Sequence, residues 1–140
     1  MSQIAVVYWS GTGNTEAMAV AVAGGAKNSG AEVTMMAAAE FGADQVAAFD
    51  AIAFGCPAMG AEALEETEFE PMFSACESKL SGKRIALFGS YGWGDGEWMR
   101  SWEESCRRAG AVLAGESVIC RGAPEEDALQ QCNALGGQLV

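Results

Sequence analysis

The sequence contains no histidine among its 140 residues. Histidine is the base of Ser-His-Asp triads and the commonest metal ligand, because its pKa lies close to physiological pH. This absence excludes histidine-based triads, histidine metal ligands and histidine general bases as the source of any activity.

Basic residues are also scarce. Eight lysines and arginines stand against nineteen aspartates and glutamates, which gives a formal net charge of −11. Such a charge repels phosphate backbones and anionic lipid headgroups. The composition therefore predicts neither a nucleic-acid partner nor a membrane partner.

The five cysteines include no C-x-x-C pair, and no apolar run approaches the roughly 18 residues of a membrane span. The N-terminal residues lack the basic and small-residue features of a secretory signal. An odd number of widely spaced cysteines is typical of free thiols in a reducing compartment and argues against a zinc or iron–sulfur site. We expect a cytoplasmic protein without a bound metal. The cysteines are Cys56, Cys76, Cys106, Cys120 and Cys132.

The sequence does contain a regular alternation of strand and helix signals. Half of the residues are hydrophobic, and we expect residues 1–140 to form a single domain around one core. The alternation predicts a parallel sheet with helices on both faces. Strands are expected at 3–8, 32–36, 50–55, 83–90 and 112–120, the last interrupted near Gly115. Helices are expected at 15–27, 44–49, 69–80, 97–109 and from 124 onward.

Ligands of such sheets bind beyond the carboxyl ends of the strands, and the first loop there has the features of a phosphate site. It holds two glycines, three hydroxyls and one amide where a helix begins, and helix-start N–H groups suit a phosphate. No Gly-Lys-Ser/Thr follows, as in a Walker A loop, and Glu16 stands where a dinucleotide fingerprint needs its third glycine. A capped helix start is the structural alternative, but a cap uses one such residue rather than four. The loop is Ser10, Gly11, Thr12, Gly13, Asn14 and Thr15.

Two further loops carry large side chains between small residues. Met59 could fill the core, but its small neighbours favour the wall of a flat apolar pocket, where Glu62 could accept a hydrogen bond from a ring N–H. Tyr91 and Trp93 are separated by single glycines in the loop 90–96. Trp93 could fold onto the core, but an aromatic plate at a loop tip suits stacking on a heteroaromatic ligand.

Acidic residues gather next to the second loop, and no lysine or arginine occurs between Lys27 and Lys79. A solvated helix start would explain part of this cluster. A docking face for basic partner proteins would explain all of it. The acids are Glu62, Glu65, Glu66, Glu68 and Glu70.

Three segments resemble those of short-chain bacterial flavodoxins, of the kind common in anaerobes. They are YWSGTGNTE at 8–16, AMG at 58–60 with EFEP at 68–71, and ALFGSYGWGDG at 86–96 with WMR at 98–100. The resemblance covers essentially the whole chain. It implies a flavodoxin-like α/β fold, in which a doubly wound five-stranded parallel sheet of order 2-1-3-4-5 has helices on both faces.

The resemblance also implies FMN as the cofactor. The first loop would bind its phosphate, Met59 and Trp93 would flank the isoalloxazine ring, and Glu62 would accept from flavin N3–H. Gly60 would offer its carbonyl to N5–H after one electron and a proton are taken up. The expected FMN-binding residues are Ser10, Gly11, Thr12, Gly13, Asn14, Thr15, Pro57, Ala58, Met59, Gly60, Ala61, Glu62, Ser90, Tyr91, Gly92, Trp93 and Gly94.

Two of these residues depart from the family pattern. Ala61 stands where many relatives have an aspartate, and Pro57 stands where the family often has a hydroxyl that can help to bind the phosphate. Ala61 leaves the Gly60 carbonyl free to turn, whereas Pro57 removes one potential phosphate donor.

The function implied by the resemblance is low-potential one-electron transfer on non-covalently bound FMN, through the semiquinone/hydroquinone couple, rather than enzyme catalysis. An acid-rich pocket without a nearby cation would oppose the anionic hydroquinone and make that couple strongly reducing. We expect a monomer whose acidic face docks basic redox partners, such as reductases and enzymes of the ferredoxin-dependent type.

Two alternatives share this scaffold. A small FMN-dependent reductase of the quinone reductase type would oxidise NAD(P)H directly, although the short chain leaves little room for a nicotinamide pocket. A receiver-type signalling domain is set aside, because Gly55 and Cys56 follow the third strand in place of an acceptor aspartate and no lysine follows Lys83.

Overall fold

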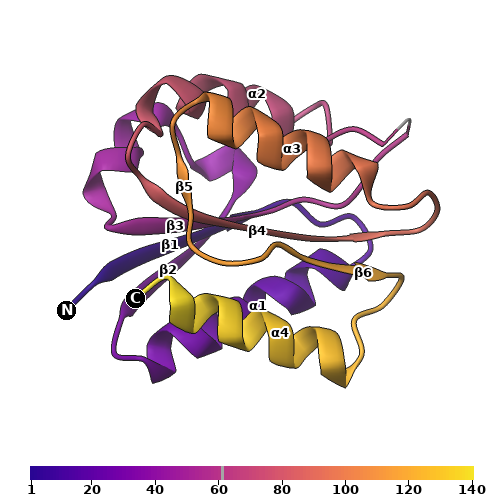
Figure 1. Cartoon of the computed structure of the whole chain (residues 1–140), viewed down its shortest axis with the longest axis horizontal. Helices are drawn as coiled ribbons and strands as arrows, with labels where there is room; N and C mark the ends of the chain where they lie inside the picture. Colours follow the sequence, from indigo (N-terminus) through magenta and orange to yellow (C-terminus); the bar gives the residue numbers. More distant parts are fainter. Residues whose placement is uncertain (61) are drawn as a thin grey trace.

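Six parallel strands form one sheet at the centre of the computed structural model, which describes residues 1–60 and 62–140 (Figure 1). The strand order is β2-β1-β3-β4-β5, and β6 also pairs with β4. The expected order 2-1-3-4-5 is therefore confirmed. The strands are β1 (Gln3–Tyr8), β2 (Glu32–Ala37), β3 (Ala51–Gly55), β4 (Arg84–Tyr91), β5 (Val112–Leu113) and β6 (Val118–Arg121).

Helices cover both faces of the sheet, with α1 and α4 on one face and α2 and α3 on the other (Figure 1). The helix expected at 69–80 ends early and continues as a 3-10 turn, and the one expected at 44–49 is 3-10 throughout. None of the helices described combines the length and apolar content needed to cross a bilayer. The helices are α1 (Asn14–Asn28), α2 (Phe69–Cys76), α3 (Glu97–Arg108) and α4 (Glu126–Gln138), and the 3-10 segments are η1 (Ala38–Glu40), η2 (Ala43–Ala48) and η3 (Glu77–Lys79).

The two faces of the sheet are packed with different kinds of residue. On one face, α1 and α4 approach so closely that a Cβ at Gly25 would overlap the Asn133 carbonyl. On the other face, aromatic rings fill the core, with the Phe54 and Phe73 centroids 5.1 Å apart in a T-shaped pair. Such rings bury large apolar areas and add edge-to-face attraction. Both cores fix the sheet, and the sheet fixes the loops at its carboxyl edge.

The fifth position of the sheet is divided between β5 and β6, as the glycine there predicts. β5 pairs with Arg84 and Ile85, whereas β6 pairs with residues 88–91 of β4. A Cβ at Gly115 would overlap the Gln138 side chain, so the absence of a side chain lets this segment pass close to α4. The interruption brings β6 alongside the end of β4, next to the candidate site.

Candidate functional site

The loops after β1, β3 and β4 meet at the carboxyl edge of the sheet. Trp9 N–H donates to the Gly55 carbonyl at 3.0 Å, and Ala58 N–H donates to the Ser90 carbonyl at 3.0 Å. These bonds continue the strand pairing into the loops, so residues far apart in the sequence surround one cavity of about 250 Å³. Its lining residues are Trp9, Gly11, Thr12, Asn14, Pro57, Ala58, Met59, Ser90, Tyr91, Gly92 and Gly122.

Nine of these lining residues are among the expected FMN-binding set. Others of the set lie in the same three loops without lining this cavity, and Ala61 lies outside the described residues. Trp9 and Gly122 were not expected from the sequence. The expected residues outside the lining are Ser10, Gly13, Thr15, Gly60, Glu62, Trp93 and Gly94.

The loop after β1 is shaped by its own side chains. Ser10 Oγ accepts hydrogen bonds from the N–H groups of Gly13 at 3.1 Å and Glu16 at 3.2 Å. Gly13 precedes α1 in the left-handed region, with a φ of 95° that favours glycine. Ser10 thus performs the structural role of a cap, and because a hydroxyl can accept while it donates, its own proton stays available to a ligand.

Several N–H groups of this loop have no hydrogen-bond partner in residues 1–60 and 62–140. Among the described residues, no hydrogen bond uses the N–H of Thr12, Asn14 or Thr15. Buried Thr15 Oγ1 and Ser90 Oγ lie 3.3 Å apart, so one hydroxyl donates to the other and one proton remains free. The start of α1 therefore presents uncharged donors, reinforced by the positive end of the helix dipole.

The loop after β3 begins as a small hairpin. Met59 and Ala63 exchange two backbone hydrogen bonds, of 2.8 Å and 3.0 Å. Gly60 follows Met59 with a φ of 50°, and open space surrounds the position where a Cβ would stand. Residue 60 can therefore turn without a steric barrier, whereas a β-branched side chain would be strained at this φ.

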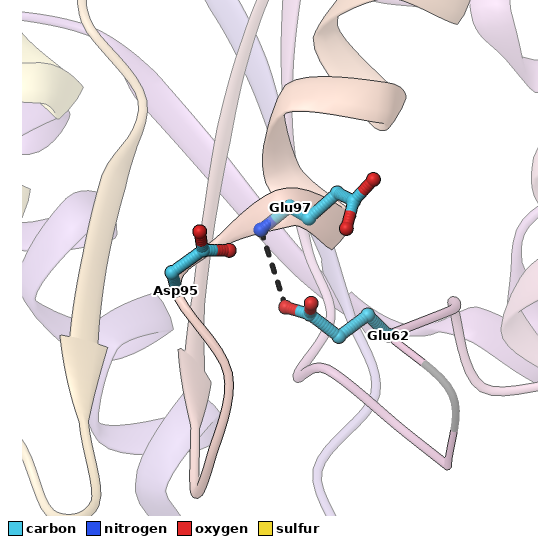
Figure 2. Close-up of side chains that lie close together, drawn as sticks. All are labelled: Glu62, Asp95 and Glu97. Atoms are coloured by element: carbon cyan, nitrogen blue, oxygen red, sulfur yellow. Dashed lines mark hydrogen bonds between the residues drawn. The ribbon is translucent and has the colours of Figure 1, made fainter.

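Glu62 points towards the start of α3 (Figure 2). One of its carboxylate oxygens accepts the N–H of Glu97 at 3.2 Å, which leaves the second oxygen available. Glu62 also lines a groove of about 300 Å³ between α2 and α3. Its own φ of 53° is unusual for a residue with a side chain.

Carboxylate oxygens of Glu62, Asp95 and Glu97 lie within 4.8 Å of one another (Figure 2). Three such oxygens could bind a divalent cation. However, Glu62 already accepts from Glu97 N–H, and Asp95 forms an ion pair of 3.1 Å with Arg100. This cluster makes the surface next to Glu62 strongly acidic.

Met59 and Trp93 are both exposed, Met59 by 38% and Trp93 by 63%. Neither fills the core, so the alternative in which these large side chains are core residues is wrong. One cation does lie nearby, against the expectation drawn from the sequence. Arg121 donates to the Gly94 carbonyl at 3.2 Å and lies over the Tyr91 ring. It comes from β6, whose position beside β4 could not be read from the spacing of basic residues.

The acids next to the hairpin do not form one uniform surface. Glu66, Glu68 and Glu70 are exposed, but Glu65 is only 4% exposed. The prediction that Glu65 belongs to an exposed docking face is therefore wrong. Burial raises the pKa of its carboxyl, but the hydroxyl of Thr67 and three backbone N–H groups outweigh burial and hold the pKa at about 2.

Trp9 joins the loop after β1 to the acidic segment. Its indole N–H donates to Glu68 Oε1 at 2.9 Å. A Cβ atom at position 11 would lie only 3.0 Å from the nearest carbon of the Trp9 ring. A single aromatic directly after the first strand was the signal that could have revealed this residue. Glycine at position 11 gives the ring room against the loop.

All five cysteines are free thiols, as the sequence predicts. Burial raises the pKa of the Cys56 thiol to about 12, and the same cause acts on Cys106 and Cys132. Thiolates are the reactive form of cysteine, so these groups are inert near neutral pH. Cys106 and Cys132 are packing residues of the two cores, and Cys56 Sγ also accepts the N–H of Glu65 at 3.4 Å.

Comparison with known proteins gives this site a context. The family model described as Flavodoxin matches residues 6–136. The flavodoxin of Clostridium beijerinckii is 46% identical over 135 residues, which are 96% of this chain and 97% of that protein. The flavodoxin of Megasphaera elsdenii is 44% identical over 133 residues, or 95% of each chain.

A solved structure agrees with these sequence matches. The solution structure of two-electron reduced Megasphaera elsdenii flavodoxin covers 97% of both chains with a TM-score of 0.90. Members of this family are FMN-binding electron-transfer proteins. Since the family model and both relatives span nearly its whole length, the chain belongs to the flavodoxin family.

Proposed function

We propose that this chain binds one FMN where the loops after β1, β3 and β4 meet, and that it carries single electrons between redox proteins. The observation that supports this most strongly is that the N–H groups of Thr12, Asn14 and Thr15 have no hydrogen-bond partner in the described part of the chain. They stand in a loop without lysine or arginine. Uncharged donors at a helix start suit one terminal phosphate.

The residues of the cavity fit the rest of this cofactor. Pro57 and Ala58 on one side and Tyr91 and Gly92 on the other supply an apolar space next to exposed main chain. Gly92 has no atom within 4 Å of its Cβ position, so a planar ring can approach the backbone there. When bound, the flavin supplies one-electron chemistry, and the protein sets its environment.

Each loop then has its own task. Ser10 holds the phosphate loop in shape and keeps a hydroxyl proton for the phosphate. Met59 and Trp93 lie exposed at the two loop tips, where they can flank a ring. Gly60 offers a carbonyl that can turn, and the second oxygen of Glu62 accepts a ring N–H.

The surface around these tips favours basic redox partners. Glu66 and Glu70 are exposed beside the hairpin, and the acids shown in Figure 2 lie next to Glu62. Two cations lie among them, Arg100 paired with Asp95 and Arg121 over the Tyr91 ring. An excess of negative charge steers positively charged proteins and disfavours further negative charge on the ring. The free thiols support a reducing compartment such as the cytoplasm, and we propose that the carrier acts as a monomer.

Cofactor extraction tests the proposal. Mass spectrometry of the ligand released from purified protein should find FMN, and the protein should accept single electrons from a chemical reductant. Recovery of FAD, or failure to take up any flavin on reconstitution, would contradict it. Rapid oxidation of NAD(P)H by the purified protein would instead support a small FMN-dependent reductase.

A further inference from the structure

Glu65 is the buried carboxylate of the segment between β3 and α2, with 4% of its surface exposed. Its two oxygens accept from the N–H groups of Thr67 at 2.8 Å, Glu68 at 2.8 Å and Phe69 at 3.0 Å. The Thr67 hydroxyl donates to it as well. These donors are the otherwise unsatisfied groups at the start of α2, so the carboxylate caps that helix from outside it.

The main chain of Glu65 connects the same helix to the sheet. Its N–H donates to Cys56 Sγ at 3.4 Å, and its carbonyl accepts the N–H of Glu70 at 2.8 Å. Cys56 directly follows β3, and its own carbonyl accepts the indole N–H of Trp98 at 3.3 Å. Glu65 is therefore bonded to the end of β3 and to the start of α2.

Between these two attachments lies the hairpin that presents Met59 and Gly60. Only one residue, Leu64, separates Glu65 from Ala63, where the hairpin closes. A residue fixed by six hydrogen bonds of its own limits how far the hairpin can move relative to the sheet. The exposed acids of the same segment have no comparable set of bonds in the described part of the chain.

We propose that Glu65 is a positioning residue of the cofactor site, which holds the hairpin closed by Met59 and Ala63 at the distance from the sheet that a flavin ring requires. This inference rests on the proposed FMN site. The carboxylate does not touch the cavity, and it acts through the start of α2 and through Cys56. Its charge is satisfied internally, so it is separate from the surface that attracts basic partners.

The charge of the carboxylate is part of this role. A glutamine in its place accepts with one oxygen only and turns an amide NH2 towards the donors of Thr67. Two donors facing each other in a buried site leave hydrogen-bonding capacity unused, which is costly. The pKa of about 2 shows that the protein stabilises the ionised form.

The test compares Glu65→Gln with Glu66→Gln, which removes the same charge from the exposed neighbour. Dissociation constants of FMN and of riboflavin are measured for each apoprotein by quenching of flavin fluorescence, at a temperature where circular dichroism shows a folded chain. Glu65→Gln should weaken the binding of both ligands by the same factor, roughly tenfold or more. This is the order of magnitude that the loss of one charge-assisted hydrogen bond produces. Glu66→Gln should leave both constants unchanged.

Equal losses of affinity for FMN and riboflavin would show that Glu65 acts on the part of the site that binds the flavin ring. The two ligands share that ring and differ only in the phosphate. Unchanged constants in folded Glu65→Gln, or a loss for FMN alone, would overturn the inference. Should Glu65→Gln not fold, Thr67→Val removes only the hydroxyl donor and should weaken both ligands in the same direction, and unchanged constants there would overturn it equally. If wild-type apoprotein binds neither flavin, the proposed function itself fails.

Discussion

The loops after β1 and β3 border one cavity but are held in place in different ways. The first is self-contained, because Ser10 Oγ bonds the N–H groups of the loop it begins. The second depends on a residue beyond its tip, since Glu65 ties its far end to β3 and α2. In both loops a neighbouring side chain forms the structural hydrogen bonds, so the groups that would contact a ligand remain free to bind it.

The difference follows from what each loop has to present. A phosphate is bound by fixed N–H groups, so a short rigid turn at a helix start is sufficient. A planar ring needs side chains and a carbonyl at some distance from the sheet, which a hairpin supplies only if its base is anchored. We therefore expect substitutions in the first loop to weaken the binding of FMN but not of riboflavin. Substitutions in the second loop should weaken the binding of both flavins equally.

The largest expected effect concerns the anchor of the second loop in acid. The pKa of Glu65 is lowered from 4.5 to about 2, so its stabilising contribution is present above pH 4.5 and is lost as the pH falls towards 2. This contribution is on the order of 3 kcal/mol. Urea unfolding from pH 7 to pH 2.5 should show the stabilities of wild type and Glu65→Gln converging in acid. Parallel curves would contradict this prediction, and Glu66→Gln, the control, should run parallel to wild type.

A charge placed in the first loop should have the next largest effect. Asn14→Asp sets a carboxylate beside these N–H groups, and repulsion between charges about 6 Å apart near a surface should weaken FMN binding roughly 100-fold. Riboflavin affinity should stay within about twofold of wild type, because riboflavin carries no phosphate. Asn28→Asp, at the far end of α1, is the control of equal charge. Equal losses for both ligands would place the phosphate elsewhere.

Substitutions of Gly60 test the role of the tip of the second loop in flavin binding. At a φ of 50°, Gly60→Val should cost about 1–3 kcal/mol and weaken FMN and riboflavin together. Gly60→Asn should cost less, because asparagine tolerates the left-handed region. Isothermal titration of both variants gives the comparison. The prediction fails if valine and asparagine behave alike.

The smallest effect should come from the exposed acids, which belong to neither anchor. Glu66→Gln combined with Glu70→Gln should slow electron transfer to a basic redox protein roughly two- to fivefold at low salt and should flatten its salt dependence. Flavin affinity should not change. Stopped-flow rates across ionic strength provide the measurement, and a rate that is flat in salt for wild type would argue against electrostatic docking.

Much of the fold could be predicted from the sequence, because alternating strand and helix signals with few connecting residues allow few topologies. Gly115 correctly indicated the division of the fifth strand. The end of α2 at Cys76 could not be read from the pattern, since the apolar stripe from Phe69 to Leu80 continues through the 3-10 turn that follows.

The meeting of the three loops at one edge of the sheet could be predicted from the sequence, but the residues that hold those loops in place could not. Glu65 is one of several glutamates in the segment 62–70, and only the folded chain shows four donors converging on it. Trp9 and Arg121 likewise act through partners about 59 and 27 residues away in the sequence. Spacing along the chain carries no signal for such contacts.

We propose that the loop after β1 is a phosphate site within a flavin site. Titration of wild-type apoprotein with FMN and with riboflavin, followed by flavin fluorescence, tests it most directly. Donated hydrogen bonds to a charged group contribute about 1.5–3 kcal/mol each, so two or three of them should make FMN bind at least about 100-fold more tightly than riboflavin. Equal affinities for the two flavins would contradict the account.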